Sequence, residues 1–266
     1  MTAGSGTPGA GAAAQRVIGV LGGMGPLATA DFYMKLVRLT PARTDQEHPR
    51  VIIDGNAKIP DRTAAVAGRG PDPTPALVAT AQNLERAGAD LIVIPCNSAH
   101  AFLGAIREAV RIPVLDIMEE VAATVAALAP APRSAGILAT QATLEMQLYP
   151  RALTRRGIGV VQPTAAEEAV VMTAIHAVKG GDLDIGVRAS VRAVAAALVA
   201  RGAGVIVLGC TELPLVFGSG DATVPVVDAT EILARAALRE AGGEYGSPPQ
   251  RCDQDGVKST VPVRRS

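Results

Sequence analysis

The sequence predicts an α/β protein made of two pseudo-symmetric Rossmann-like lobes, each with a parallel sheet flanked by helices and with the functional site in the cleft between them. Short apolar runs rich in valine and isoleucine alternate with longer amphipathic segments, a pattern typical of parallel strands covered by helices on both faces. A chain of 266 residues with 48% apolar residues can also bury two such cores.

Eight runs are the predicted strands, in chain order. They begin at Val17, Val51, Leu91, Pro113, Gly136, Gly159, Val205 and Pro225. The segments between them are long enough for the crossover helices that parallel strands need.

An internal repeat defines the two lobes. GADLIVIPCNS from Gly88 resembles GAGVIVLGCTE from Gly202, 114 residues later, and IPVLDIMEE from Ile112 is answered by VPVVDATEI from Val224. We therefore expect a disordered head (residues 1–15) and a disordered tail (246–266). The first lobe is expected in two pieces (16–118 plus 225–245), because the last helix returns to it, and the second lobe spans 119–224.

Composition and charge exclude several classes of protein. The 25 basic and 25 acidic residues are not segregated, which argues against a nucleic acid or a membrane as partner. The head lacks the features of a secretory signal, and the three cysteines (Cys96, Cys210, Cys252) suit neither a disulfide framework nor a zinc site. The sequence favours a cytoplasmic protein that binds a small molecule and no metal.

Cys96 and Cys210 each end a predicted strand at equivalent positions of the repeat. Ligands in open α/β sheets bind at the carboxyl ends of the strands, so the two thiols are expected to face one another across the cleft. The residues that follow them, Asn97, Ser98 and Thr211, are good helix caps. We therefore expect each thiol at a helix N-terminus, where its pKa falls and where a carboxylate can bind.

Two opposed thiols can invert one carbon centre, because one removes a proton from one face while the other returns a proton to the opposite face. A pyridoxal enzyme would need a Schiff-base lysine, and no motif in this sequence places one. The sequence therefore predicts no cofactor, and backbone amides in a dry cleft must stabilise the carbanion.

Five ordered motifs then point to a known family. VIGVLGGMGPLATADFY from Val17, TPARTDQEHP from Thr40, NAKIPDRTAAV from Asn56, PCNSAHAF from Pro95 and GCTELP from Gly209 together resemble the aspartate racemases of the aspartate/glutamate racemase superfamily. The resemblance covers roughly residues 17–241. The resemblance implies that Cys96 and Cys210 interconvert L- and D-aspartate by proton transfer, without pyridoxal phosphate. It also implies assembly that is usually a homodimer.

The resemblance also assigns Arg62 and Lys179 to the side-chain carboxylate of a dicarboxylic amino acid, and it implies that Met24 lines the substrate pocket. Asn97, Ser98 and Thr211 are expected either to bind the α-carboxylate or α-amino group or simply to cap helices. His100 and Glu212 are candidates for assisting the neighbouring thiols, although His100 can equally fill a helix–sheet interface. Glutamate racemases usually carry histidine where this chain has Glu212, which favours aspartate.

Three alternatives stay open at this point. The first is a racemase directed to glutamate or of broad specificity, and the second is a two-lobed amino-acid binding or sensing protein that closes on its ligand without chemistry. The third is a redox sensor that forms a disulfide between Cys96 and Cys210, which requires the two residues to approach to bonding distance.

Overall fold

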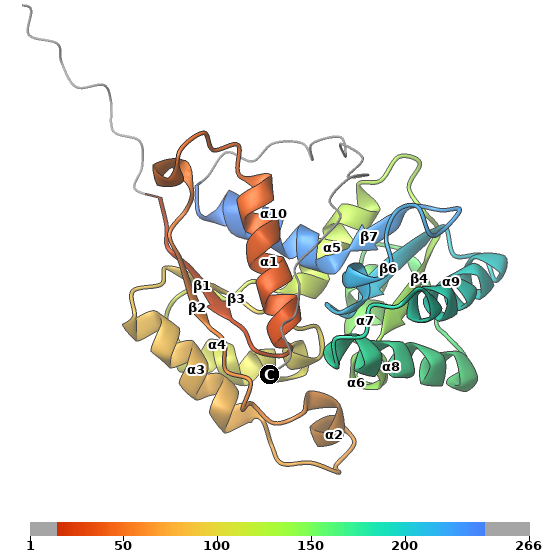
Figure 1. Ribbon diagram of the computed structural model, residues 1–266, viewed down its shortest axis with the longest axis horizontal. Helices are drawn as coiled ribbons and strands as arrows, with labels where there is room; N and C mark the ends of the chain where they lie inside the picture. Colours follow the sequence, from red (N-terminus) through yellow and green to blue (C-terminus); the bar gives the residue numbers. More distant parts are fainter. Residues whose placement is uncertain (1–14, 243–266) are drawn as a thin grey trace, which may run out of the picture.

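Two parallel sheets form the framework of the protein in a computed structural model that describes residues 15–242. The strand orders are β2-β1-β3 and β5-β4-β6-β7, and every neighbouring pair is parallel. Figure 1 shows the two sheets in adjacent lobes, each flanked by helices. The α/β fold with two lobes is therefore confirmed, whereas the predicted tail, with Cys252, and nearly all of the predicted head lie outside the described residues.

The first lobe is built around the sheet β2-β1-β3. Its elements are β1 (Ile18–Leu21), α1 (Pro26–Leu39), β2 (Val51–Asp54), α2 (Arg62–Val66), α3 (Thr74–Arg86), β3 (Leu91–Val93) and α4 (Leu103–Ala109). The predicted strand at Pro113 is reduced to a single bridge between Val114 and Ile92.

The second lobe follows α5 (Ile117–Ala126) and repeats this plan. Its elements are β4 (Ser134–Ala139), α6 (Gln141–Glu145), α7 (Leu148–Thr154), β5 (Gly159–Val161), α8 (Ala165–Lys179), α9 (Ile185–Ala200), β6 (Val205–Gly209) and β7 (Val226–Asp228). The chain then continues into α10 (Ala229–Glu240), which packs against α1 and α5.

The boundary predicted near residue 224 needs one correction. Strand β7 was expected in the first lobe, but it pairs with β6 in the second sheet. The bridge at Val114 has the same place beside β3, so the segment after each cysteine completes its own sheet before the chain crosses over. Only then does α10 return to the first lobe, where the backbone N–H of Arg16 donates to Ala241.

The repeated aspartate explains how each crossover helix begins. Asp116 accepts a hydrogen bond from the backbone N–H of Met118, and Asp228 accepts from Thr230 and Glu231. Both are side-chain N-caps, which stabilise a helix start by about 1 kcal/mol. In both repeats a residue paired in the sheet is followed by an aspartate that caps the next helix. The aspartate therefore fixes where α5 and α10 begin.

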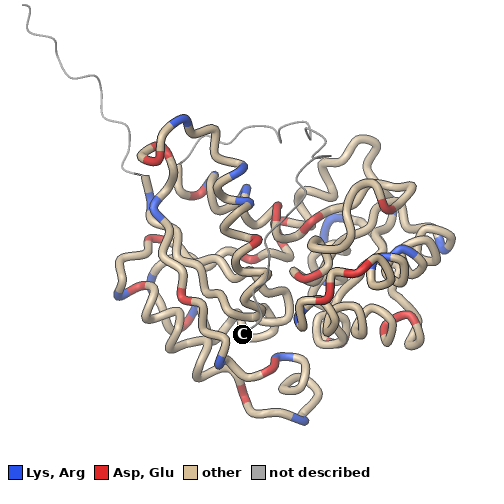
Figure 2. The backbone as a smooth tube through the Cα atoms, viewed as in Figure 1, with Lys and Arg blue, Asp and Glu red and all other residues tan. Residues whose placement is uncertain are grey.

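One apolar core extends through both lobes. Phe32 of α1, Tyr149 of α7 and Leu233 of α10 are fully buried in it, so the lobes share a packed interface. Basic and acidic residues are interspersed over both lobes in Figure 2. Among residues 15–242, no helix combines the length and apolarity that crossing a membrane demands.

Candidate active site

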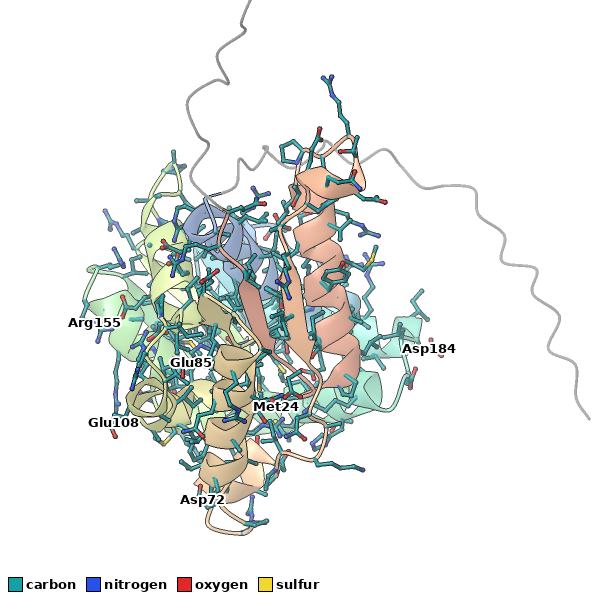
Figure 3. The ribbon with its side chains drawn as sticks, turned by 90° about the vertical axis from the view of Figure 1, so that its left-hand side faces the viewer. Met24, Asp72, Glu85, Glu108, Arg155 and Asp184 are labelled. Carbon is teal, nitrogen blue, oxygen red and sulfur yellow. The ribbon has the colours of Figure 1, made fainter. Side chains whose placement is uncertain are left out.

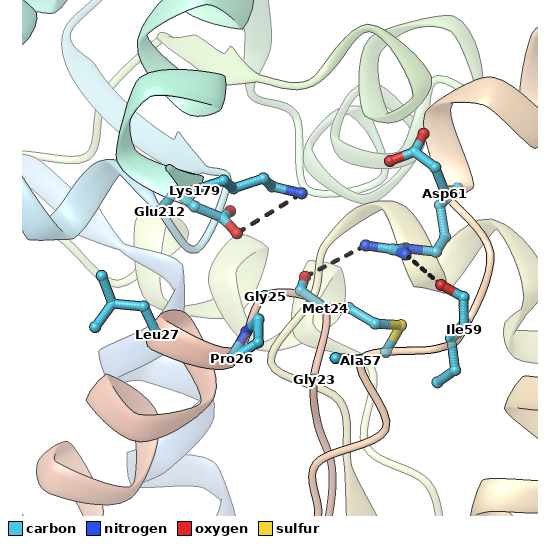
Figure 4. A pocket seen from close by; sticks show the side chains of 11 residues that line it. Gly23, Met24, Gly25, Pro26, Leu27, Ala57, Ile59, Asp61, Lys179 and Glu212 are labelled. Carbon is cyan, nitrogen blue, oxygen red and sulfur yellow. Dashed lines mark hydrogen bonds and ion pairs between the residues drawn. The ribbon is translucent and has the colours of Figure 1, made fainter. Parts of the chain in front are cut away.

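A cavity of about 280 Å³ opens where the two lobes meet. The first lobe contributes the turn after β1 and the segment around α2, and the second contributes the end of α8 and the loop after β6 (Figure 4). The lining residues are Gly23, Met24, Gly25, Pro26, Leu27, Ala57, Ile59, Asp61, Arg62, Lys179 and Glu212. The cavity therefore lies at the carboxyl ends of the strands, as the sequence predicted.

The glycine turn after β1 forms one wall of the cavity. Gly23 has φ +89°, and a Cβ at that position would lie 2.4 Å from the backbone carbon of Asn56, so only glycine fits. The N–H of Gly23 donates to Oγ1 of Thr29 at 2.8 Å, and that hydroxyl donates to the carbonyl of Gly25 at 2.9 Å. These bonds fix the start of α1, near which Figure 3 places Met24. The positive end of the helix therefore faces the cavity.

Arg62 enters the cavity from α2, whose N-cap is Asp61. Its side chain is buried, and its guanidinium donates to the carbonyls of Pro60 at 2.9 Å and Met24 at 3.5 Å. Its Nε is buried without a hydrogen-bond partner. A fixed guanidinium with an unused donor is suited to a carboxylate ligand.

The two cysteines lie behind the walls of the cavity, one in each lobe. Cys96 packs in the same apolar cluster as Met24, and Cys210 lies beside Glu212. Each residue is only 4% exposed, and both are free thiols. The disulfide that a redox sensor would need is therefore not formed in the structure.

A short helix follows each cysteine, as expected, and both are 3₁₀ helices, Ser98–Phe102 and Leu213–Leu215. The expected fall in the pKa of the thiol is wrong at Cys210. Burial raises the pKa of the Cys210 thiol well above its ordinary value, and the Glu212 carboxylate raises it further. Desolvation and a negative neighbour therefore outweigh the backbone dipoles at Cys210.

Asn97 and Thr211 do not use their side chains as helix caps. Oδ1 of Asn97 accepts a 2.6 Å hydrogen bond from the phenol of Tyr149, and Nδ2 of Asn97 is buried without a partner. The Thr211 hydroxyl donates to Glu212 at 3.4 Å, while Ser98 lies beside Cys96. The side chain of Asn97 therefore bonds Tyr149 of the second lobe and that of Thr211 bonds Glu212, and neither caps a helix.

Tyr149 joins the two cysteine loops, and sequence reasoning missed it. Its ring lies so close to Gly209 that a Cβ there would be 2.7 Å from the ring carbon Cε2, while its hydroxyl bonds Asn97. The residue before Cys210 and the residue after Cys96 therefore contact the same side chain. No local pattern in the sequence around Tyr149 indicates this contact.

His100 is bonded to the backbone through both ring nitrogens. Nε2 accepts from the N–H of Ile117 at 3.3 Å, so Nδ1 carries the proton and donates to the carbonyl of Cys96 at 2.9 Å. Burial lowers the pKa of His100 despite the opposing charge of Asp116. The neutral ring thus positions the Cys96 loop against the start of α5.

Glu212 and Lys179 form an ion pair at the cavity wall (Figure 4). The Lys179 ammonium lies 3.8 Å from Oε1 of Glu212, while Oε2 accepts a 2.9 Å hydrogen bond from the Cys210 thiol. Burial alone would lower the pKa of Lys179, but Glu212, then Cys210 and Cys96, outweigh it and raise the pKa. Lys179 is therefore a stable cation near both thiols.

No group of three or more potential metal ligands is found among residues 15–242. The charged groups of the cavity are Arg62, Lys179, Glu212 and Asp61. Together with the N-terminus of α1, the two cations make the cavity suitable for a small carboxylate.

Comparison with known proteins identifies the family. The model of the Asp/Glu/Hydantoin racemase family matches residues 21–237, a span that includes the whole cavity and both sheets apart from the first three residues of β1. The chain belongs to this family. It is therefore an isomerase of the amino-acid racemase type.

Individual relatives agree on the family. The chain is 28% identical over 229 residues to the broad specificity amino-acid racemase RacX of Bacillus subtilis, covering 84% of this chain and 96% of that protein. It is 29% identical to the structure of Picrophilus torridus aspartate racemase, with a TM-score of 0.79 over 87% of this chain and 96% of that one. A glutamate racemase of Koribacter versatilis is 32% identical, covering 60% of this chain and 55% of that protein.

Proposed function

We propose that the protein interconverts L- and D-aspartate by two-base proton transfer between Cys96 and Cys210. The observation that carries this proposal is the position of the cavity between two cysteine loops that meet at Tyr149. Each thiol comes from a different lobe, which suits proton transfer at opposite faces of one carbon. The fixed surroundings reduce the reorganisation that a carbanion would otherwise demand.

The charge of the cavity supports a dicarboxylic substrate. Arg62 and Lys179 enter from different lobes, so two carboxylates can be drawn apart with Cα held between them. The buried Nε of Arg62 and Nδ2 of Asn97 are donors without partners, and a carboxylate would satisfy them. Glu212 already pairs with Lys179, so we assign the side-chain carboxylate mainly to Arg62.

A broad-specificity racemase is the second candidate. The similarity to RacX supports it, and the acidic side chains of Asp61 and Glu212 in the same cavity could accept an amino group. The guanidinium of Arg62 favours aspartate over a broad range of substrates, because it is buried and fixed in a position suited to a side-chain carboxylate.

Assembly as a homodimer is also part of the proposal, as the family resemblance implied. Tyr33 and Met34 of α1 are 42% and 45% exposed. Large apolar side chains grouped on one helix are typical of a surface that another chain covers. Light scattering of the purified protein tests this directly, since a monomeric mass would contradict it.

The decisive experiment is proton NMR of L-aspartate, L-glutamate and L-lysine in D₂O with purified reduced protein and no added pyridoxal phosphate. We expect the Cα–H signal of aspartate to disappear fastest, with formation of the D-enantiomer. Cys96→Ala and Cys210→Ala should abolish inversion, and each should retain exchange of at most one enantiomer. Similar rates for all three substrates would favour broad specificity, while binding without any exchange would favour an amino-acid sensor.

A further inference from the structure

The two cysteines have neighbours of different charge, although they occupy equivalent positions of the repeat. The thiol of Cys210 donates a hydrogen bond to Oε2 of Glu212 at 2.9 Å. The sulfur of Cys96 lies 3.6 Å from the hydroxyl of Ser98, the residue equivalent to Glu212. Both cysteines are equally buried, and Cys210 has a carboxylate where Cys96 has a hydroxyl.

Glu212 is held in one place beside a cation. Lys179 faces Oε1, and the hydroxyl of Thr211 donates to Oε2. Oε1 also packs against Gly25, where an added Cβ would lie 3.1 Å away, and the side chain is only 4% exposed. The Cys210 thiol is the donor in the 2.9 Å bond to Oε2, so the proton in this bond is on the sulfur.

The other groups around Cys210 do not reverse this arrangement. Lys179 favours the thiolate, but burial and Glu212 outweigh it, and the pKa of Cys210 is raised. Tyr149 faces Cys210 from α7 as a neutral phenol, because burial raises its own pKa. Arg62 and Cys96, both from the first lobe, lie near Lys179. Cys96 raises the pKa of Lys179 and Arg62 lowers it.

We propose that Glu212 keeps a proton on Cys210 in the ligand-free enzyme, so that Cys210 begins as the proton donor and Cys96 as the proton acceptor. This inference rests on the proposed two-cysteine reaction. The thiolate of Cys96 takes the Cα proton, leaving the electron pair on carbon, and the S–H of Cys210 then gives its proton to the opposite face. Cys210 is left as a thiolate beside Glu212.

The reverse direction therefore begins from the less favourable of the two forms. A thiolate on Cys210 lies against a carboxylate, and like charges at this distance repel strongly in a buried site. Glu212 thus acts on the reaction through Cys210, as a positioning residue that sets which thiol carries the resting proton.

Thiol alkylation tests the proposal without any substrate. Iodoacetamide reacts with thiolates, so its rate at Cys96 and Cys210 would be measured from pH 5 to 10 in the ligand-free protein, with each peptide quantified by mass spectrometry. We expect the midpoint for Cys210 to lie well above the ordinary value for a cysteine thiol, and Cys210 to be alkylated about tenfold more slowly than Cys96 at neutral pH. Faster alkylation of Cys210 than of Cys96 at pH 7 would overturn the proposal.

Two variants move the midpoint of Cys210 in opposite directions. Glu212→Gln keeps the size but removes the charge, and should lower it by about one unit or more. Lys179→Met removes the cation that faces the carboxylate and should raise the midpoint of Cys210. Glu212→Asp keeps the negative charge that Glu212→Gln removes, so its midpoint should lie closer to the wild-type value. Ser98→Ala is the matched control at the equivalent position and should leave Cys210 unchanged. If Glu212 had only a structural role, Glu212→Gln and Lys179→Met would not shift the midpoint of Cys210 in opposite directions.

The same variants separate this inference from the proposed function. If NMR detects no α-proton exchange while the alkylation midpoints behave as expected, the racemase reaction fails and the unequal thiols remain. If exchange and inversion occur while Glu212→Gln leaves the midpoint of Cys210 unmoved, the function stands and the role of Glu212 is wrong.

Discussion

The phenol oxygen of Tyr149 lies 2.6 Å from Oδ1 of Asn97, and this bond joins the second lobe to the loop that carries Cys96. The same ring covers Gly209, the residue before Cys210. One buried side chain therefore sets how the two cysteine loops meet. The geometry of the candidate site consequently depends on a residue that does not line the cavity.

Tyr149→Phe should impair both stability and racemisation. It leaves Oδ1 of Asn97 buried without a partner, which costs about 1–3 kcal/mol, and it frees the amide to rotate. We expect the free energy of unfolding in urea to fall by about that amount and kcat to fall roughly tenfold. Tyr33→Phe, at an exposed tyrosine of α1, should change neither. Loss of stability with unchanged kcat would limit Tyr149 to a structural role.

His100 should make stability depend on pH in the acidic range. Burial lowers the pKa of His100 in the folded state, so the unfolded chain binds the proton more readily. The contribution of the neutral ring to the free energy of unfolding is therefore complete above about pH 6.5 and is lost as the pH falls below that value. The slope from this residue is at most about 1.4 kcal/mol per pH unit.

Urea denaturation between pH 5 and 7.5 measures this contribution. His100→Gln should lower stability at pH 7.5 and flatten the acidic slope, whereas His176→Gln, at an exposed histidine, should leave the slope intact. An unchanged slope in His100→Gln would mean that the ring binds a proton equally well in the folded and the unfolded chain.

Regular patterns made the fold predictable from the sequence. Apolar β-branched runs and the repeat around Cys96 and Cys210 located both sheets and both thiols, because strand formation and helix crossing depend on local sequence. The contact between Tyr149 and Asn97 spans 52 residues and has no local signal. The short 3₁₀ helix after Cys210 also escaped prediction, since capping residues favour a helix start without fixing its length.

Arg62 should determine discrimination between a carboxylate and an amide. Because a charge-assisted hydrogen bond contributes about 1.5–3 kcal/mol, Arg62→Met should lower kcat/KM for L-aspartate by roughly 10- to 100-fold. Exchange of the Cα proton of L-asparagine, followed by NMR over long incubations, should fall much less. Arg69→Met, at an exposed arginine close in sequence, is the control. Equal losses for both substrates would show that Arg62 acts only through the carbonyls of Pro60 and Met24.

Gly23 and Gly68 separate the two reasons for requiring glycine. Both have positive φ, +89° and +66°, but a Cβ on Gly23 would collide with the backbone of Asn56, whereas Gly68 has open space around it. Gly68→Ala should therefore cost only the conformational strain, about 1–2 kcal/mol. Gly23→Ala should cost more and also displace the turn that bears Met24, with loss of activity. Urea denaturation and initial rates of both variants measure the difference, and equal destabilisation would mean that the turn relaxes without consequence for the cavity.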